Sequence, residues 1–156
     1  MTLTQEARQA VRPGICPATV LVVDDDPQAL AALQRTFRGE PYETVFTADP
    51  FEALEWVKHR DVHLVITDEF MPGMMGTELL EAVRHRLPDA SVILLTGYPN
   101  MAVSYRGFQQ RVDLLMVKPW NDLELRGQVR RLLRDDGWDV PEPSAGAETD
   151  DERGDA

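Results

Sequence analysis

The segment VLVVDDDP, residues 20–27, determines how the rest of the chain is interpreted. Its first four residues, Val20–Val23, are apolar without alternation, which predicts a strand covered by helices on both faces, as in a parallel sheet. Asp26 followed by Pro27 predicts a helix start, because Asp accepts hydrogen bonds from free backbone amides and proline suits the first helical position. A buried strand that leads directly into a helix is one βα unit, the repeating element of α/β proteins.

The same unit recurs along the chain between residues 18 and 134, where short apolar runs alternate with segments of helical period. The expected strands are Val20–Val23, Thr44–Thr47, Leu64–Thr67, Val92–Leu95 and Leu114–Val117. The first two expected helices start after Asp26 and Asp49, and the third spans Thr77–Leu87. The fourth, Asn100–Gln110, has the weakest period, and the fifth starts after Asn121 or Asp122. We therefore predict an α/β fold in which five βα units surround one parallel sheet.

The length and composition predict one globular domain. The chain has 156 residues, of which 43% are apolar, enough for one hydrophobic core. Its net charge of −11 is unevenly distributed, because residues 135–156 hold nine acidic residues and one basic residue, whereas residues 1–134 carry only −3. We expect an N-terminal extension over residues 1–16, the folded domain over residues 17–136, and an acidic, disordered tail over residues 137–156.

Charge, cysteine content and hydropathy also limit the expected partners and location. The excess of acid argues against binding to nucleic acid or to an anionic membrane. One cysteine, Cys16, and three histidines leave no disulfide within the chain and no Cys/His zinc site. Residues 1–13 lack the apolar core of a secretion signal, and no run approaches the about 20 apolar residues of a membrane span. We therefore expect a cytoplasmic protein.

Polar residues that could carry chemistry directly follow four of the expected strands: Asp24–Asp26, Asp68, Thr96 and Lys118. The carboxyl ends of parallel strands meet at one edge of the sheet, where ligands bind. Carboxylates gathered there repel one another unless a cation neutralises them, and oxygen ligands without His or Cys favour Mg²⁺. A hydroxyl and an ammonium beside such a cation suit a transferring phosphoryl group.

Four motifs in this order, VLVVDDDP, LVITDEFMPGMMG, VILLTG and LLMVKPW, resemble the signatures of the receiver domain of two-component response regulators. The resemblance covers about residues 18–134. It implies a flavodoxin-like, doubly wound sheet of five parallel strands in the order 2-1-3-4-5, with the (βα)5 arrangement. It also implies a stand-alone, chemotaxis-regulator-like phosphoprotein rather than an enzyme, which catalyses only its own phosphorylation and dephosphorylation.

The resemblance assigns a role to each residue of the acidic site. Asp68 would be the phosphoacceptor, attacking the phosphorus atom of a phosphohistidine as a carboxylate nucleophile. Asp24 and Asp25 match the acidic pair that holds Mg²⁺ together with Asp68, and Asp25 would be the more direct ligand of the two. The backbone carbonyl of Phe70 would complete the ligands that the protein supplies.

The resemblance also assigns roles to the residues after the last two strands. Thr96 matches the hydroxyl that turns toward the phosphoryl group, and Lys118 matches the amine that pairs with it. Pro119 matches a proline that usually follows a cis bond in this family. Asp26 lies outside the pattern, and its expected role is to cap the first helix.

In signalling terms, the resemblance implies that a histidine kinase or a histidine phosphotransfer protein donates the phosphoryl group. The phosphorylated domain would then change its contacts with a downstream protein in trans, since the chain ends soon after the fifth expected helix. The sequence leaves open whether phosphorylation produces a homodimer.

Two departures from the family concern aromatic residues. Most receivers carry Tyr or Phe three residues before the lysine, where this chain has Leu115, which puts the usual readout in doubt. Our hypothesis is that Tyr98 and Tyr105 take over the role of the exposed aromatic residue. Phe70 and Tyr98 stand two residues after Asp68 and Thr96, where smaller or polar side chains are common. Crowding of the attacking water by these two rings predicts a long-lived phosphorylated form.

Two other classes of function remain open from the sequence. A haloacid-dehalogenase-type phosphatase would use Asp24 and Asp26 as nucleophile and acid/base, but Gln28 stands where that family has Thr or Val, and Asp68 would have no role. A receiver-like adaptor that is never phosphorylated would act through protein contacts alone. The acceptor, hydroxyl and amine present in this chain count against the adaptor.

Overall fold

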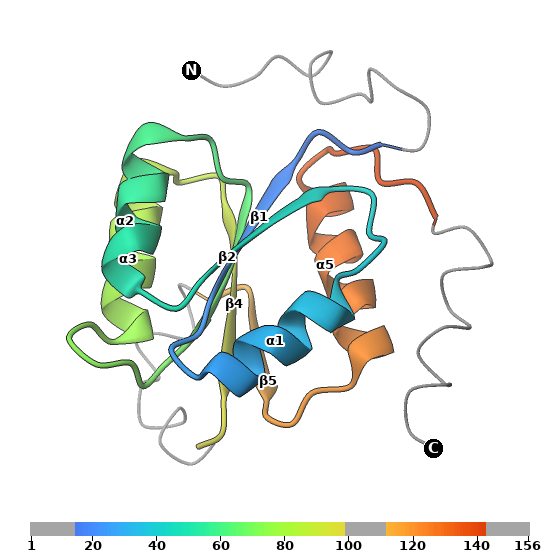
Figure 1. Cartoon of the computed structure of the whole chain (residues 1–156). Coiled ribbons are helices and arrows are strands. Elements are labelled where there is room, and N and C mark those ends of the chain that lie inside the picture. The colour runs from blue at the N-terminus through green and yellow to red at the C-terminus, as the bar shows by residue number, and fades with distance from the viewer. Residues whose placement is uncertain (1–14, 99–111, 143–156) are drawn as a thin grey trace, which may run out of the picture.

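The computed structural model describes residues 15–98 and 112–142 (Figure 1). Five parallel strands form one sheet: β1 (Thr19–Val23), β2 (Glu43–Thr47), β3 (Leu64–Asp68), β4 (Ser91–Thr96) and β5 (Leu114–Val117). They lie in the order β2-β1-β3-β4-β5, with every neighbouring pair parallel. The expected doubly wound sheet and its strand order are therefore confirmed.

The described helices cover the two faces of this sheet: α1 (Pro27–Thr36), α2 (Pro50–His59), α3 (Gly76–Arg86) and α5 (Asp122–Asp135). Figure 1 shows α1 and α5 on one face and α2 and α3 on the other. Asp26, Asp49 and Asn121 cap α1, α2 and α5 by accepting a hydrogen bond from a first-turn amide. The helix expected at Asn100–Gln110 lies outside the described residues.

The central strands are buried because each face of the sheet has its own hydrophobic core. On β1, Val20 and Val22 pack into the core beneath α1 and α5, whereas Leu21 and Val23 pack into the core beneath α2 and α3. Successive side chains of a strand point to opposite faces, so a strand with helices on both sides must be apolar throughout. The run Val20–Val23 therefore fixes β1 at the centre of the sheet and Asp24 at its carboxyl end.

The folded part extends further at both ends than the sequence predicts. Cys16, which was expected in an N-terminal extension, is 1% exposed, and its amide donates to Pro41 O at 2.9 Å. Trp138 and Val140, which were expected in a disordered tail, are buried in the same core as Cys16. The expectation of disorder is therefore wrong for residues 137–142, while residues 143–156 lie outside the described part.

The ring of Trp138 explains why the chain turns back onto the domain after α5. It packs against the His63 ring with 4.5 Å between the centroids, and its amide donates to Leu133 O at 3.0 Å. Arg134 donates to Val140 O at 2.8 Å, which closes this turn over the last residues of α5. In the described ranges no helix is both long and apolar enough to cross a lipid bilayer.

Candidate functional site

Three carboxylates meet at the carboxyl edge of the sheet. Asp24 and Asp25 directly follow β1, Asp68 ends β3, and these two strands are hydrogen-bonded neighbours. One oxygen from each carboxylate lies within 4.8 Å of the others. Asp24 is 1% exposed, and its Oδ1 accepts from the Asp26 amide at 3.0 Å, which fixes its orientation.

This group of oxygens fits a hard divalent cation. Mg²⁺ prefers oxygen ligands and needs only one or two carboxylates because it retains several waters. Three carboxylates this close together would repel one another without positive charge nearby. Asp24, Asp25 and Asp68 are therefore the residues of the described part that could hold Mg²⁺.

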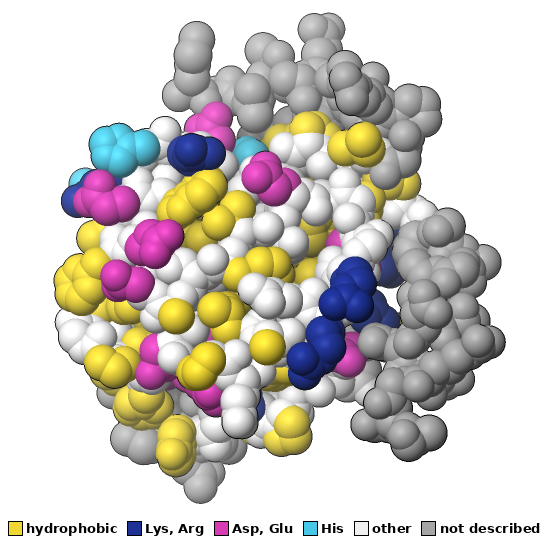
Figure 2. Space-filling view, viewed as in Figure 1, with side chains coloured by type: hydrophobic (Ala, Val, Ile, Leu, Met, Phe, Trp, Pro, Cys, Tyr) yellow, Lys and Arg dark blue, Asp and Glu magenta, His cyan; other side chains and the backbone are white. Residues whose placement is uncertain are grey.

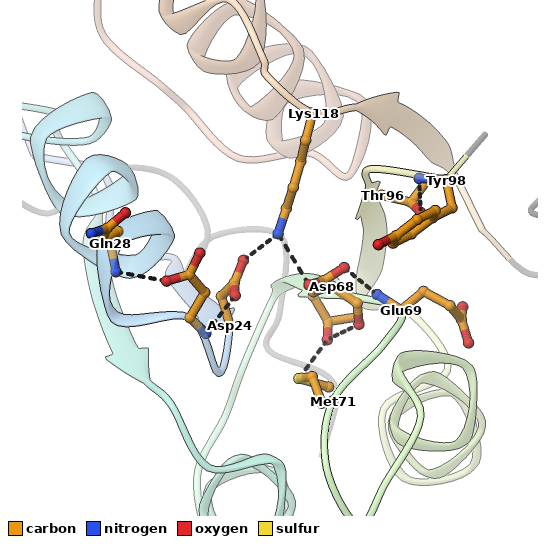
Figure 3. A network of polar contacts seen from close by, with 10 residues as sticks. Asp24, Gln28, Asp68, Glu69, Met71, Thr96, Tyr98 and Lys118 are labelled. Carbon is orange, nitrogen blue, oxygen red and sulfur yellow. Dashed lines mark hydrogen bonds and ion pairs between the residues drawn. The ribbon is translucent and has the colours of Figure 1, made fainter.

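Lys118 brings a positive charge to the same group (Figure 3). Its Nζ lies 2.7 Å from Asp24 Oδ2 and 3.0 Å from Asp68 Oδ2. Burial lowers the pKa of Lys118, but its hydrogen bonds to the two carboxylates and their negative charges outweigh this, so the pKa lies above its usual value. The ammonium is therefore held in its charged form between the first and third strands of the sheet.

The backbone around Lys118 directs its side chain into the site. Lys118 directly follows β5, and its amide donates to Thr96 O at 2.8 Å, extending the β4–β5 pairing by one residue. The Lys118–Pro119 peptide bond is cis, as the family resemblance implies.

Thr96 is the last residue of β4, which pairs with β3 on the side opposite β1. It is 1% exposed, and its Oγ1 accepts from the Tyr98 amide at 3.0 Å (Figure 3). The Tyr98 ring is 60% exposed and meets the Phe70 ring edge to face, with 5.3 Å between centroids and 89° between planes. The two aromatic residues singled out from the sequence therefore contact each other, and they join the loops that follow β3 and β4.

Asp26 and Tyr105 are also singled out from the sequence. Asp26 caps α1 by accepting from the Gln28 amide at 3.0 Å, which is the role expected for it. Tyr105 lies outside the described residues. Asp24, Asp25, Asp68 and Lys118 are thus brought together at one place.

Sequence reasoning missed the buried residue Glu69. Its amide donates to Asp68 Oδ1 at 2.7 Å, and its Oε1 accepts from Thr77 Oγ1 at 2.8 Å. Burial raises the pKa of Glu69, and the charges of Asp68 and Glu78 add to this, against the lowering effect of the Thr77 hydrogen bonds. The available signal was a charged residue directly after the candidate acceptor, in a segment that is otherwise apolar.

Sequence reasoning also missed a polar contact that joins α5 to α1. Trp120 Nε1 donates to both Thr36 Oγ1, at 3.1 Å, and Asp122 Oδ1, at 3.0 Å. Thr36 Oγ1 is itself 2.6 Å from Asp122 Oδ1, so the three side chains form a closed set. The loop that carries Lys118 is thereby anchored to the last turn of α1, two residues after the lysine.

The basic residues of α5 are partly engaged in ion pairs. Figure 2 shows Lys and Arg side chains gathered over the region of α1 and α5, whereas acidic side chains are spread over the α2–α3 side. Arg130 donates to both carboxylate oxygens of Glu40, and Arg126 Nε lies 3.7 Å from Glu40 Oε1. These contacts pair two of the arginines with the loop after α1.

Comparisons with known proteins identify the class. The sequence model of the response regulator receiver domain matches residues 20–146, so the chain belongs to the receiver domain family. Receiver domains of this family act in two-component signal transduction. The fold and strand order described above agree with this assignment.

Two curated relatives illustrate the relationship. The transcriptional regulatory protein YvrH of Bacillus subtilis is 32% identical over 118 residues, which is 75% of this chain and 49% of YvrH. The DNA-binding response regulator MtrA of Mycolicibacterium smegmatis is 31% identical over 115 residues, covering 74% of this chain and 50% of MtrA. The chain therefore spans about half the length of these relatives.

Solved structures give the same fold. The signal receiver domain of an HD domain-containing protein from Pseudomonas fluorescens Pf-5 has a TM-score of 0.71 and 30% identity, covering 77% of this chain and 97% of that chain. The response regulator TrrA from Thermotoga maritima, in complex with Mg²⁺-BeF, has a TM-score of 0.67 and 34% identity, covering 74% of this chain and 98% of that chain.

Proposed function

We propose that the chain accepts a phosphoryl group on Asp68 from a histidine kinase or a histidine phosphotransfer protein. The observation that carries this proposal is the position of Lys118 Nζ, within 3.0 Å of both Asp24 and Asp68, beside the carboxylate group that fits Mg²⁺. In the transfer, an Asp68 carboxylate oxygen forms a bond to phosphorus while the bond from phosphorus to the histidine nitrogen breaks. The imidazole leaves with that electron pair.

The neighbouring residues provide positive charge and hydrogen bonds for this transfer. Asp24, Asp25, Asp68 and the backbone carbonyl of Phe70 are proposed to hold Mg²⁺, which would offset negative charge on the phosphoryl oxygens. The Lys118 ammonium is already charged and lies 3.0 Å from Asp68 Oδ2, so it can pair with a phosphoryl oxygen on Asp68 with little reorganisation.

Thr96 is proposed to convert phosphorylation into a change of surface. Its hydroxyl oxygen accepts from the Tyr98 amide at 3.0 Å, and a phosphoryl group on Asp68 would offer a charged acceptor for the hydroxyl proton, drawing Oγ1 toward Asp68. Turning toward that acceptor releases the Tyr98 amide. Since Tyr98 is 60% exposed, the loop after β4 is where a partner would sense the change.

We propose that the signal then passes to another protein in trans, within the cytoplasm. The net charge of −3 over residues 1–134 supports a protein partner over nucleic acid. No enzymatic activity is proposed beyond phosphorylation and dephosphorylation of the chain itself.

The test is phosphotransfer profiling against the purified histidine kinases of the source organism. The parent chain should gain one acid-labile phosphate, and Asp68→Ala should gain none. Asp61→Ala, which removes an exposed carboxylate near the opposite end of β3, should behave as the parent. Steady release of phosphate from a general phosphomonoester would instead favour a haloacid-dehalogenase-type phosphatase.

The adaptor alternative is tested separately with beryllofluoride and Mg²⁺, which together imitate the aspartyl phosphate. The proposal predicts a saturable change in tryptophan fluorescence that Trp120→Phe removes, because Trp120 follows Lys118 by two residues. A parent chain that shows neither this response nor phosphotransfer from any kinase would be an adaptor.

A further inference from the structure

Glu69 combines burial with a direct link to the candidate phosphoacceptor. The residue is 3% exposed, although a buried charged side chain is costly unless hydrogen bonds or opposite charges compensate it. Its backbone amide holds Asp68 Oδ1 at 2.7 Å, the carboxylate oxygen that Lys118 does not contact. Asp68 is thereby held from two sides, by Lys118 on Oδ2 and by the Glu69 amide on Oδ1.

The side chain of Glu69 reaches away from Asp68 to the start of α3. Thr77 Oγ1 donates to Glu69 Oε1 at 2.8 Å, and Thr77 lies in the first turn of α3. Met75, at the N-cap position of α3, makes no side-chain capping hydrogen bond. Glu69 therefore binds the first turn of α3 through the Thr77 hydroxyl, at a helix start where the N-cap residue supplies no oxygen of its own.

The backbone reinforces the same connection. The Gly76 amide donates to Glu69 O at 2.8 Å. A Cβ atom at Gly76 would lie 2.0 Å from Asp68 O, so glycine is required for the helix to approach this closely. The first turn of α3 and the segment that carries the acceptor thus form one hydrogen-bonded unit.

We infer that Glu69 is a positioning residue for phosphoryl transfer, which keeps Asp68 aligned by binding Thr77 of α3. The inference rests on the proposed function and adds a residue to it. Without the side-chain bonds, residue 69 is free to shift, and its amide would no longer hold Asp68 Oδ1 in one place. The carbonyl of Phe70, the proposed metal ligand, follows directly in the same segment. A displacement of the acceptor by about 1 Å is enough to slow a reaction about a hundredfold.

The test compares variants that remove or keep the Glu69–Thr77 contact. Thr77→Val removes the hydroxyl at nearly constant volume, whereas Thr77→Ser keeps it. Glu69→Ala removes the carboxyl group, whereas Glu69→Gln keeps an acceptor oxygen at the same position. Leu80→Ala is the control for general damage, because Leu80 is fully buried on α3 and, in the described part of the chain, no side-chain hydrogen bond joins it to the segment that carries Asp68.

Each variant is phosphorylated with acetyl phosphate and Mg²⁺ over a range of donor concentrations. The maximal rate and the donor concentration at half saturation are measured separately. Thermal unfolding is followed in parallel. We expect Thr77→Val and Glu69→Ala to lower the maximal rate about tenfold or more, with half saturation little changed. Thr77→Ser and Glu69→Gln should restore most of the rate, and Leu80→Ala should lose stability while keeping the rate.

The outcomes separate this inference from the proposed function. If the parent chain takes no phosphate from acetyl phosphate or from any kinase, the proposed function fails and the inference fails with it. If the parent is phosphorylated and Thr77→Val reacts at the parental maximal rate, the inference alone is overturned. It is also overturned if Leu80→Ala slows the reaction as much as Thr77→Val does.

Discussion

Lys118 Nζ lies 2.7 Å from Asp24 Oδ2, although the two residues are separated by 94 positions in the sequence. Asp24 is 1% exposed, and the Lys118 side chain is 21% exposed. Taking a carboxylate out of water is costly unless a positive charge compensates it. In the described structure, Lys118 therefore offsets the cost of burying Asp24 as well as contacting the candidate acceptor.

Replacing this lysine should make stability dependent on a divalent cation. We expect Lys118→Ala to lower the free energy of unfolding by about 3 kcal/mol without metal, the lower end of the range for a broken buried ion pair. Added Mg²⁺ should recover part of this loss, because a cation bound only by the folded state stabilises it. Chemical denaturation with and without Mg²⁺ measures both effects.

The control for the lysine is another ion pair on the same protein. Lys58→Ala removes a surface pair with Glu55, in which the two side chains are 46% and 61% exposed, and should change stability by less than about 1 kcal/mol. Equal effects of Lys118→Ala and Lys58→Ala would show that the pair with Asp24 has no special role in stability.

The contact between Phe70 and Tyr98 predicts a slowly hydrolysed phosphorylated form. Their rings meet edge to face at 5.3 Å between centroids, two residues after Asp68 and Thr96. Rings at this position should restrict the approach of water to the phosphorus atom. We expect Phe70→Asn and Tyr98→Ala to lose phosphate about tenfold faster than the parent, a change of about 1.4 kcal/mol in the barrier.

Loss of labelled phosphate after removal of the donor measures this rate. Tyr98→Phe retains the ring contact and removes only the hydroxyl, so it should lose phosphate at the parental rate. Unchanged lifetimes in Phe70→Asn and Tyr98→Ala would mean that water reaches the phosphorus atom without passing the rings.

The amide of Tyr98 should report activation. It donates to Thr96 Oγ1 at 3.0 Å, so rotation of the threonine hydroxyl toward a phosphoryl group would break that bond. We expect the Tyr98 amide resonance to shift on addition of beryllofluoride and Mg²⁺, and the shift to be largely lost in Thr96→Ala. A Tyr98 amide that does not respond in the parent would exclude the loop after β4 as the site of readout.

Much of the fold could be predicted because local chemistry and tertiary structure agree. The apolar run Val20–Val23 places β1 within one residue of its observed start at Thr19, since only a strand covered on both faces tolerates such a run. Asp26 and Asp49 mark the starts of α1 and α2 because each supplies the capping oxygen itself. The convergence of Asp24, Asp68 and Lys118 follows from the topology of a parallel sheet.

The missed contacts depend on partners that only the folded chain brings together. Trp120 donates a hydrogen bond to Thr36, 84 positions away in the sequence, so no local sequence pattern predicts this contact. Glu69 accepts from the Thr77 hydroxyl in the first turn of α3 from outside the helix, and the N-cap residue Met75 makes no side-chain capping bond. Trp138 stands among acidic and turn residues that resemble a solvated tail, and its burial depends on a surface formed partly by His63.

The burial of Trp138 predicts that the segment after α5 stabilises the domain. Trp138 is 5% exposed and shares a core with Cys16, so Trp138→Ala should cost about 3–5 kcal/mol in the free energy of unfolding. Leu123→Ala, which truncates a side chain that is 62% exposed on α5, should cost little. A Trp138→Ala variant as stable as Leu123→Ala would restore the original expectation of a tail that begins at residue 137.

Cys16 provides an independent probe of the same segment. Burial raises the pKa of its thiol above the usual range, with a further contribution from the charge of Asp139. Because the folded pKa lies above the unfolded value, deprotonation favours unfolding, so this contribution to stability is complete below the usual pKa of a cysteine thiol and declines as the pH rises above it. At pH 8 the parent should therefore react slowly with a thiol reagent, through rare opening of the fold. If Trp138→Ala lowers the free energy of unfolding by about 3 kcal/mol, the rate of Cys16 labelling should rise about a hundredfold. Fast labelling of the parent would contradict the burial of Cys16 beside this segment.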